Sequence, residues 1–126
     1  MNALRIYVPG DAVAVACGAD DIAAAIAALA AKRKIPAEII RNGSRGMHWL
    51  EPRLEVATDK GRIAYGPVDL ADIESVFAAM AAGGGEHKLR IGVPEEHPFL
   101  KKQTRLTFAR CGLVDPRSLD DYKAHD

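Results

Sequence analysis

The sequence contains few cysteines and no excess of either charge. Its 126 residues include two cysteines, Cys17 and Cys111, which form neither a CxxC pair nor a Cys/His cluster. This pattern argues against a secreted disulfide framework and a structural zinc site, and it fits a reducing, cytoplasmic setting. Lysine plus arginine equals aspartate plus glutamate at 17 each, so no overall field would concentrate nucleic acid or anionic lipid.

Long hydrophobic runs are also missing. No stretch approaches the ~18 apolar residues that a membrane span requires, and the N-terminus lacks the basic region and apolar run of a signal peptide. A chain of this length buries enough apolar surface to fold without disulfides or metals. We therefore expect a soluble chain with one compact core.

The first forty residues follow a strand, helix, strand pattern. Alternating residues predict a strand over 4–8, which ends at a Pro-Gly-Asp turn. Asp20 or Asp21 then suits the cap of a helix that carries Ile22, Ile26 and Leu29 on one face. A second strand over 37–41 would pair with the first in parallel, through a right-handed crossover.

The middle of the chain predicts a hairpin and a second helix. Strands over 54–58 and 62–66 flank Asp59-Lys60-Gly61, whose glycine can take the positive φ of a short turn. Asp69 suits the cap of a helix over 70–82, where four apolar residues recur at helical spacing before three glycines end it. The packing that buries every apolar face is an α/β, thioredoxin-like layout over residues 1–85.

Residues 86–126 differ in character from the first part of the chain. They are dense in charge and proline, and we expect a C-terminal arm or linker there. Asp115-Pro116 resembles the cap and first-turn proline of a short helix over 117–126.

No residue set predicts catalysis, cofactor binding or a metal site. The histidines (His48, His87, His97 and His125) include no i, i+4 pair. Cys17 precedes the first helix, where a thiol pKa can be lowered, but it has no resolving cysteine nearby, so a buried or inert thiol is the favoured interpretation. The three glycines at 83–85 lack the spacing of a nucleotide-binding loop.

Two segments resemble a known family. The first, RNGSRGMHWLEPRLEV followed by GRIAYGPVDLADIESVF, resembles the second half of the thioredoxin-like ferredoxin domains of NADH dehydrogenase and related hydrogenase and formate dehydrogenase subunits. The second, EEHPFLKKQTRLTFARCGLVDPRSLDDYKAHD, is similar to the opening of the flavoprotein subunit of complex I and its relatives. Their combination closely resembles the N-terminus of the beta subunit of soluble, molybdenum-dependent, NAD-linked formate dehydrogenase.

In those ferredoxin domains, the resemblance implies a loop after the second strand with two cysteines spaced C-x3-C. Ser44 and His48 stand at the matching positions. A [2Fe-2S] cluster needs four ligands, normally thiolates, which two cysteines at unrelated positions cannot supply. We therefore expect no cofactor in this chain, and a loop that keeps the path of a cluster-binding loop, with Gly43 and Gly46 at its tight turns.

The resemblance also implies cofactors and partners for a longer subunit. Such flavoprotein subunits bind FMN, a [4Fe-4S] cluster and NAD, and the motifs for these groups would lie after Asp126. The implied partners are a cluster-bearing gamma subunit and a molybdenum alpha subunit, which oxidises formate. The complex passes the electrons through iron-sulfur clusters and FMN to NAD. This chain would be a non-catalytic structural and docking domain of the enzyme.

Met47, Trp49 and Leu50 are available to fill the volume of the missing cluster, and for Trp49 core packing is the favoured interpretation. The alternative is an exposed cluster of Met47, His48 and Trp49 that forms a possible interface, because exposed aromatic residues often carry binding energy. A free-standing thioredoxin-like redox protein or an adaptor remains the second hypothesis for the whole chain.

Overall fold

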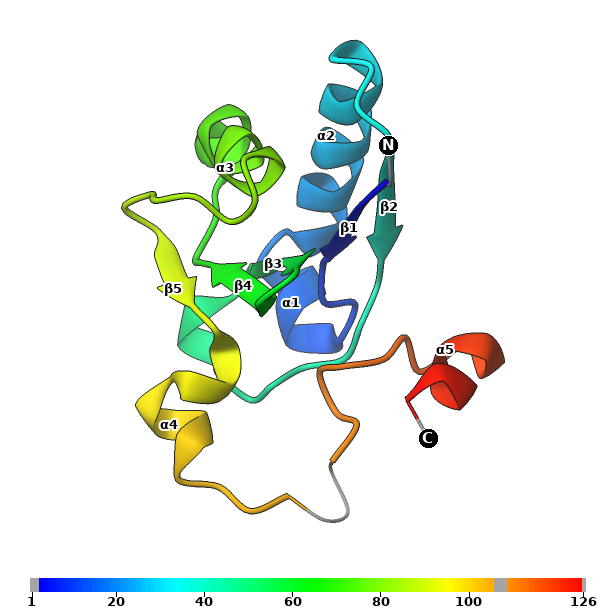
Figure 1. Cartoon of the computed structure of the whole chain (residues 1–126), viewed down its shortest axis with the longest axis vertical. Helices are drawn as coiled ribbons and strands as arrows, with labels where there is room; N and C mark the ends of the chain where they lie inside the picture. The colour runs from blue at the N-terminus through cyan, green and yellow to red at the C-terminus, as the bar shows by residue number, and fades with distance from the viewer. Residues whose placement is uncertain (1–2, 106–108, 126) are drawn as a thin grey trace.

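A mixed five-stranded sheet forms the centre of the molecule (Figure 1). The computed structural model describes residues 3–105 and 109–125. The strands are β1 (Leu4–Tyr7), β2 (Ala37–Ile40), β3 (Leu54–Thr58), β4 (Gly61–Tyr65) and β5 (Arg90–Gly92), in the order β2-β1-β3-β4-β5. β1 and β2 are parallel, and the other neighbours are antiparallel. The predicted α/β order and the parallel pair are confirmed.

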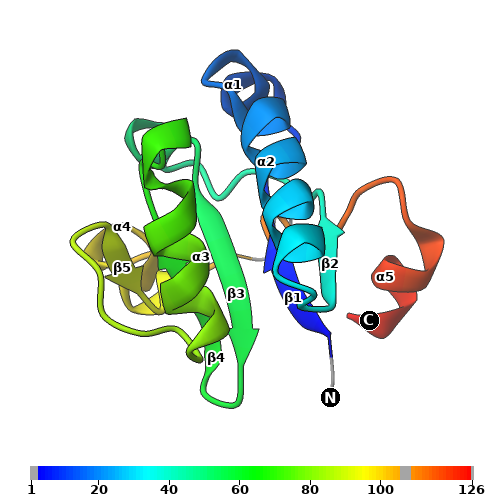
Figure 2. The ribbon, with the colours of Figure 1, turned by 90° about the horizontal axis from the view of Figure 1, so that it is seen from above.

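Two helices cover one face of this sheet, as Figure 2 shows. They are α2 (Ala19–Lys32) and α3 (Ile73–Ala81). Their apolar sides form the main core with alternate strand residues such as Ile6, Val56 and Ile63. Burial of this apolar surface is the main favourable term in folding.

The start of the first helical region differs from the prediction. A separate short helix, α1 (Ala12–Ala16), precedes α2, and the side chain of Asp11 accepts a hydrogen bond from Ala14 N at 3.4 Å to cap it. α2 itself begins after Gly18, so Asp20 and Asp21 lie in its first turn instead of at its cap. There they still favour the positive end of the helix dipole.

The hairpin and the second helix follow the predicted pattern. Gly61 has a φ of +102° at the β3–β4 turn. Asp69 and Asp72 form a reciprocal capping box at a 3-10 turn, η2 (Leu70–Asp72), which leads into α3. Tyr65 on β4 donates a hydrogen bond from its hydroxyl to Gly85 O at 2.7 Å, which fixes the chain just after α3.

The chain after Gly85 contributes to the sheet, because β5 pairs with β4. It continues through η3 (Pro94–Glu96) and α4 (Pro98–Lys101) to α5 (Leu119–Ala124). Ser118 caps α5 by accepting from Asp121 N at 3.1 Å, so the predicted cap at Asp115-Pro116 is wrong. No helix in the described part of the chain is long and apolar enough to span a membrane.

Gly83 and Gly84 provide a matched test of the end of α3. Both have a φ of +84°, but a Cβ at Gly84 would lie 2.8 Å from Ile63 Cγ1, whereas one at Gly83 would meet nothing within 4 Å. We expect Gly84→Ala to destabilise the fold by about 1–3 kcal/mol more than Gly83→Ala, because only Gly84→Ala adds a steric clash to the backbone strain. Chemical denaturation of both variants measures this difference, and equal losses would contradict the packing described.

Candidate functional site

The segment between β2 and β3, here called the 41–53 loop, holds the residues that the sequence singled out. The side chain of Ser44 accepts a hydrogen bond from Gly46 N at 2.9 Å, and Gly46 has a φ of +84°. His48 is exposed at the start of a 3-10 turn, η1 (His48–Leu50). The Ser44 hydroxyl therefore stabilises the turn of the loop, and the His48 side chain faces solvent.

Met47 and Trp49 occupy opposite environments. Met47 is fully buried, as the prediction that it fills the volume beneath the loop requires, and it is not available as an interface residue. Trp49 is 57% exposed, so its predicted core packing is wrong. Its ring contacts Phe99 edge-on, with centroids 5.1 Å apart, and His97 lies at 6.4 Å. Trp49, His97 and Phe99 form what we call the aromatic cluster.

Arg45 turns inward beneath the loop and is 4% exposed. Its Nε and Nη2 atoms donate to the two carboxylate oxygens of Glu55, at 3.0 and 2.9 Å. Its Nη1 atom donates to Glu95 Oε1 at 3.1 Å. Because the guanidinium meets Glu55 through two parallel hydrogen bonds, this contact fixes the geometry of the loop against β3.

A second buried guanidinium completes the arrangement. Arg53 is fully buried, and its Nη1 atom donates to the same Glu55 carboxylate. Glu51 accepts from Arg53 N at 3.1 Å through one oxygen, and its other oxygen lies 3.9 Å from Arg53 Nε. We call these five residues the ion-pair network: Arg45, Glu51, Arg53, Glu55 and Glu95. The network balances two buried arginines with buried carboxylates, which is the condition for burying charge at all.

The pKa values of Arg45 and Glu51 are both raised in the network. Burial raises the pKa of Glu51, and the nearby carboxylates of Asp11 and Glu55 raise it further, while Arg53 opposes the shift. Burial alone would lower the pKa of Arg45, but the carboxylates of Glu55 and Glu95 outweigh it and raise the value. Arg45 therefore stays charged, and Glu51 gains a proton more readily on acidification than an ordinary glutamate does.

The C-terminal arm packs directly on this loop. The side chain of Asn42 donates to Gly112 O at 2.7 Å, and Gly43 N donates to Val114 O at 3.2 Å. Gly112 has a φ of +83°, and a Cβ there would lie 2.4 Å from Arg45 Cγ. Only glycine fits at position 112, because the backbone of the arm lies in close contact with the buried Arg45 there.

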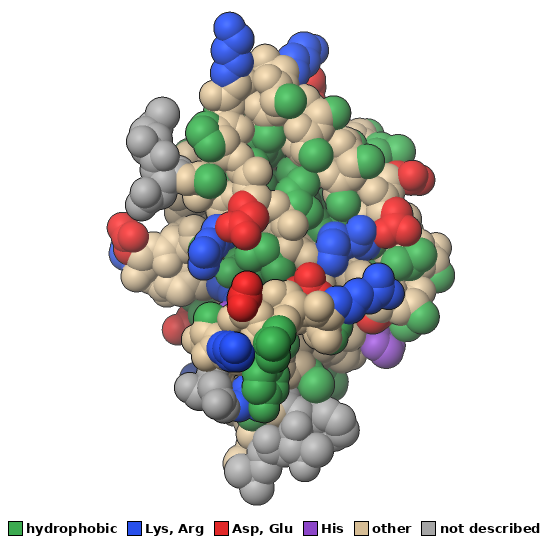
Figure 3. Space-filling view, turned by 90° about the vertical axis from the view of Figure 1, so that its right-hand side faces the viewer, with side chains coloured by type: hydrophobic (Ala, Val, Ile, Leu, Met, Phe, Trp, Pro, Cys, Tyr) green, Lys and Arg blue, Asp and Glu red, His purple; other side chains and the backbone are tan. Residues whose placement is uncertain are grey.

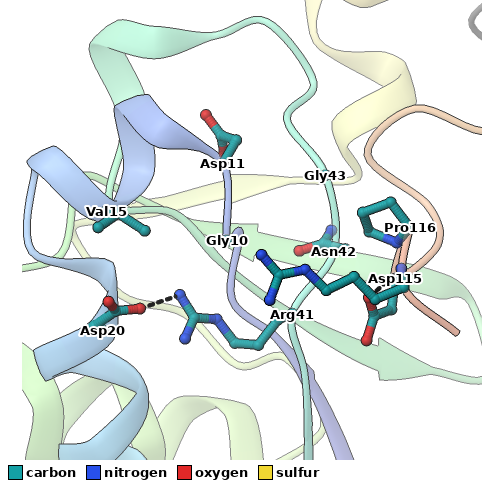
Figure 4. Close-up of a pocket in the computed structure, with 10 residues that line it drawn as sticks. Gly10, Asp11, Val15, Asp20, Arg41, Asn42, Gly43, Asp115 and Pro116 are labelled. Carbon is teal, nitrogen blue, oxygen red and sulfur yellow. Dashed lines mark hydrogen bonds and ion pairs between the residues drawn. The ribbon is translucent and has the colours of Figure 1, made fainter.

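A polar pocket of about 420 Å³ lies between the arm and the β1–α1 turn (Figure 4). Arg41 spans it, donating to Asp20 Oδ1 at 2.7 Å and to the Val8 and Pro9 carbonyls at 3.0 and 3.2 Å. The Asn42 Oδ1 and Asp11 Oδ1 atoms have no partner among the described residues. The lining residues include no nucleophile paired with a base, so they do not form a catalytic set.

The described residues do not fit an iron-sulfur cluster. Cys17 and Cys111 are both exposed, so a buried Cys17 is not observed. The Ser44 hydroxyl is engaged by the backbone, and the buried Arg45 beside it is donor-only and cannot ligate iron. Over residues 3–105 and 109–125, no group of three or more His, Cys, Asp or Glu side chains could hold a metal ion.

Comparison with known proteins identifies the fold. Neither a family model nor a curated protein matches the chain. Similar solved structures are thioredoxin-like [2Fe-2S] ferredoxins from Aquifex aeolicus. One wild-type structure is 16% identical, with a TM-score of 0.58 over 73% of this chain and 99% of the ferredoxin. A second is 16% identical, with a TM-score of 0.60 over 78% and 98%. A cysteine-to-serine variant is 19% identical, with a TM-score of 0.56 over 71% and 98%. This chain therefore has the predicted thioredoxin-like fold.

The sequence-based prediction missed the ion-pair network. Arg53 and Glu55 are two residues apart in extended chain and so share one face of the sheet, which is a signal that was present in the sequence. The partnership of Arg45 with Glu55 and Glu95 depends on how the 41–53 loop folds over the sheet, and no local pattern encodes it.

Glu55 and Glu95 provide a matched pair for testing the network. Glu55→Gln removes the charge of the buried carboxylate that both buried guanidiniums share, and we expect it to destabilise the fold by about 3–5 kcal/mol. The Glu95 side chain is 56% exposed, so Glu95→Gln should cost at most about 1 kcal/mol. Urea unfolding at neutral pH measures both variants. Similar losses for the two would contradict a buried network centred on Glu55.

The raised pKa of Glu51 predicts a pH dependence of stability. A carboxyl that binds its proton more tightly in the folded state contributes stability below its unfolded pKa, and this contribution is lost as the pH rises through the folded pKa. Relative to Glu51→Gln, the native chain should therefore lose stability as the pH rises above the ordinary glutamate range. Denaturant unfolding of both proteins between about pH 4 and 8 measures the difference. A pH-independent difference, or one that grows in favour of the native chain, would contradict the burial of Glu51.

Proposed function

We propose that this chain is a cluster-free docking domain of the flavoprotein (beta) subunit of an NAD-dependent formate dehydrogenase. The observation that carries the proposal is the ion-pair network beneath the 41–53 loop. The fold is that of thioredoxin-like [2Fe-2S] ferredoxins, but the interior beneath this loop holds the paired charges of Arg45, Arg53 and Glu55. A domain of this kind contributes a shape and a surface to its subunit, and no redox centre.

The aromatic cluster supplies the docking surface in this proposal. Trp49 and Phe99 are 57% and 40% exposed, and their edge-on contact holds both rings in place. Rigid, exposed aromatic side chains lose little conformational entropy when a partner covers them, and tryptophan is among the residues that most often dominate binding energy. His97 within the cluster and the exposed His48, next to Trp49 in the chain, add polar groups beside the two apolar rings.

We infer the remaining parts of the enzyme from the resemblance in sequence. The complete subunit would bind FMN, a [4Fe-4S] cluster and NAD beyond the arm, and it would work in the cytoplasm. Its partners would be the cluster-bearing gamma subunit and the molybdenum alpha subunit, where formate is oxidised. The packing of the arm on the 41–53 loop supports this arrangement, because it fixes the direction in which the chain leaves the domain.

Reconstitution with purified subunits tests the proposal. The full chain is mixed with the gamma subunit and the flavin-binding remainder of the beta subunit of such an enzyme, and binding is measured by interferometry. We expect Trp49→Ala to weaken binding by about 30-fold or more, since truncating an interface hot spot costs at least ~2 kcal/mol. Leu70→Ala is the control, because Leu70 is similarly exposed at 60% but lies in η2, the turn before α3.

Two results would contradict the proposal. The first is an absence of binding to either subunit, or equal losses in the Trp49→Ala and Leu70→Ala variants. The second is a brown protein with a [2Fe-2S] absorption spectrum after anaerobic reconstitution with iron and sulfide. That spectrum would favour an independent electron-transfer protein.

A further inference from the structure

The outer edge of β2 carries a row of backbone groups without strand partners. Val8 N donates to Ile40 O, and Leu4 N donates to Pro36 O, so the even-numbered residues of β2 face β1. In a parallel ladder the alternate residues then point their N–H and C=O groups the other way. The N–H and C=O groups of Ile39, and of Arg41 just after β2, face outward. No described strand pairs with them because β2 is an edge strand of the sheet.

The arm already uses the end of this same row. Gly43 follows Arg41 in the outward series, and its N–H donates to Val114 O at 3.2 Å. A turn of the arm therefore bonds to the edge at one position. Upstream of that bond no described strand pairs with the edge. A groove of about 430 Å³ runs there between Ile39, Ile40 and the side chains of α5. The β2 and α5 side of the molecule faces the viewer in Figure 3, where hydrophobic side chains lie between charged ones.

The charges along this groove are mostly negative. Its charged and titratable lining residues are Arg5, Glu38, Asp115, Asp120, Asp121 and His125. Arg5 is paired with Glu38 at 3.3 Å, and Asp121 lies 3.5 Å from His125. Asp120 is exposed and has no ion-pair partner among the described residues. With four carboxylates against one arginine and one histidine, the groove favours a cationic occupant.

We propose that this groove binds an extended, basic segment of a partner protein, which adds to β2 as a sixth strand. Backbone hydrogen bonds to Ile39 and Arg41 would supply affinity, as in other cases of strand addition to a free sheet edge. Asp120 and its neighbours would select lysine or arginine side chains on the bound strand. The site is separate from the aromatic cluster and does not depend on the function proposed above.

Titration with a synthetic peptide tests this site. The probe is a fluorescent hexapeptide of alternating lysine and valine, long enough at ~3.3 Å per residue to cover the outward groups of β2. We expect saturable binding to the full chain, and no binding of the peptide with glutamate in place of each lysine. Asp120→Lys should weaken binding by about tenfold. Glu74→Lys, the same charge reversal in the first turn of α3, is the control and should leave binding unchanged.

Backbone pairing is tested separately from charge. Two further peptides are methylated on their backbone nitrogens, one at every lysine and the other at every valine. In an added strand the N–H groups of only one of these two sets of residues face β2. One methylated peptide should lose binding and the other should keep it. NMR should also show slowed amide exchange at Ile39 and Arg41 when the unmodified peptide is present.

Several outcomes would overturn the proposal. The first is no binding up to about 1 mM peptide, because any weaker affinity would be too low for specific recognition. The second is equal binding of the acidic peptide. Equal losses in Asp120→Lys and Glu74→Lys, equal affinities of the two methylated peptides, or unchanged exchange at Ile39 and Arg41 would each overturn it as well.

Discussion

The bidentate ion pair between Arg45 and Glu55 is the interaction on which the rest of this site depends. It joins the 41–53 loop to β3 where both side chains are buried, and Glu55 also neutralises the fully buried Arg53. A buried charge without its partner is strongly destabilising, so the loop has little freedom to adopt another path. The exposed position of Trp49 and the packing of the arm, at Gly112, against the loop follow from the path that this pair fixes.

Other segments of the chain pack on both faces of the sheet. The helices cover one face with an apolar core, while the other face carries charged residues in alternate strand positions. Arg62 stacks over Tyr7 at 3.6 Å and donates to Leu113 O at 2.8 Å. The arm therefore packs on this second face through polar and aromatic contacts. The two docking surfaces that we propose, the aromatic cluster and the edge of β2, lie outside these contacts.

Much of the fold was predictable because its signals are local. The apolar periodicity of the second helix and the turn at Gly61 each lie within a few residues. β5 was missed because three residues of little intrinsic preference become a strand only by pairing with β4. Trp49 was assigned to the core by its apolar character, but the loop directs Met47 inward and leaves the indole exposed. The contacts of Arg45 with Glu55 and Glu95 join residues up to fifty positions apart, beyond any sequence pattern.

The most direct test of this account is NMR of the arginine side chains at neutral pH. A buried Arg45 Nε–H that donates to Glu55 at 3.0 Å should give a resolved signal whose exchange with water is much slower than that of the exposed Arg33. Glu55→Gln should remove this protection, because the charged acceptor is lost. If the Arg45 signal exchanges as fast as that of Arg33, the guanidinium is not buried beneath the loop, and the central claim fails.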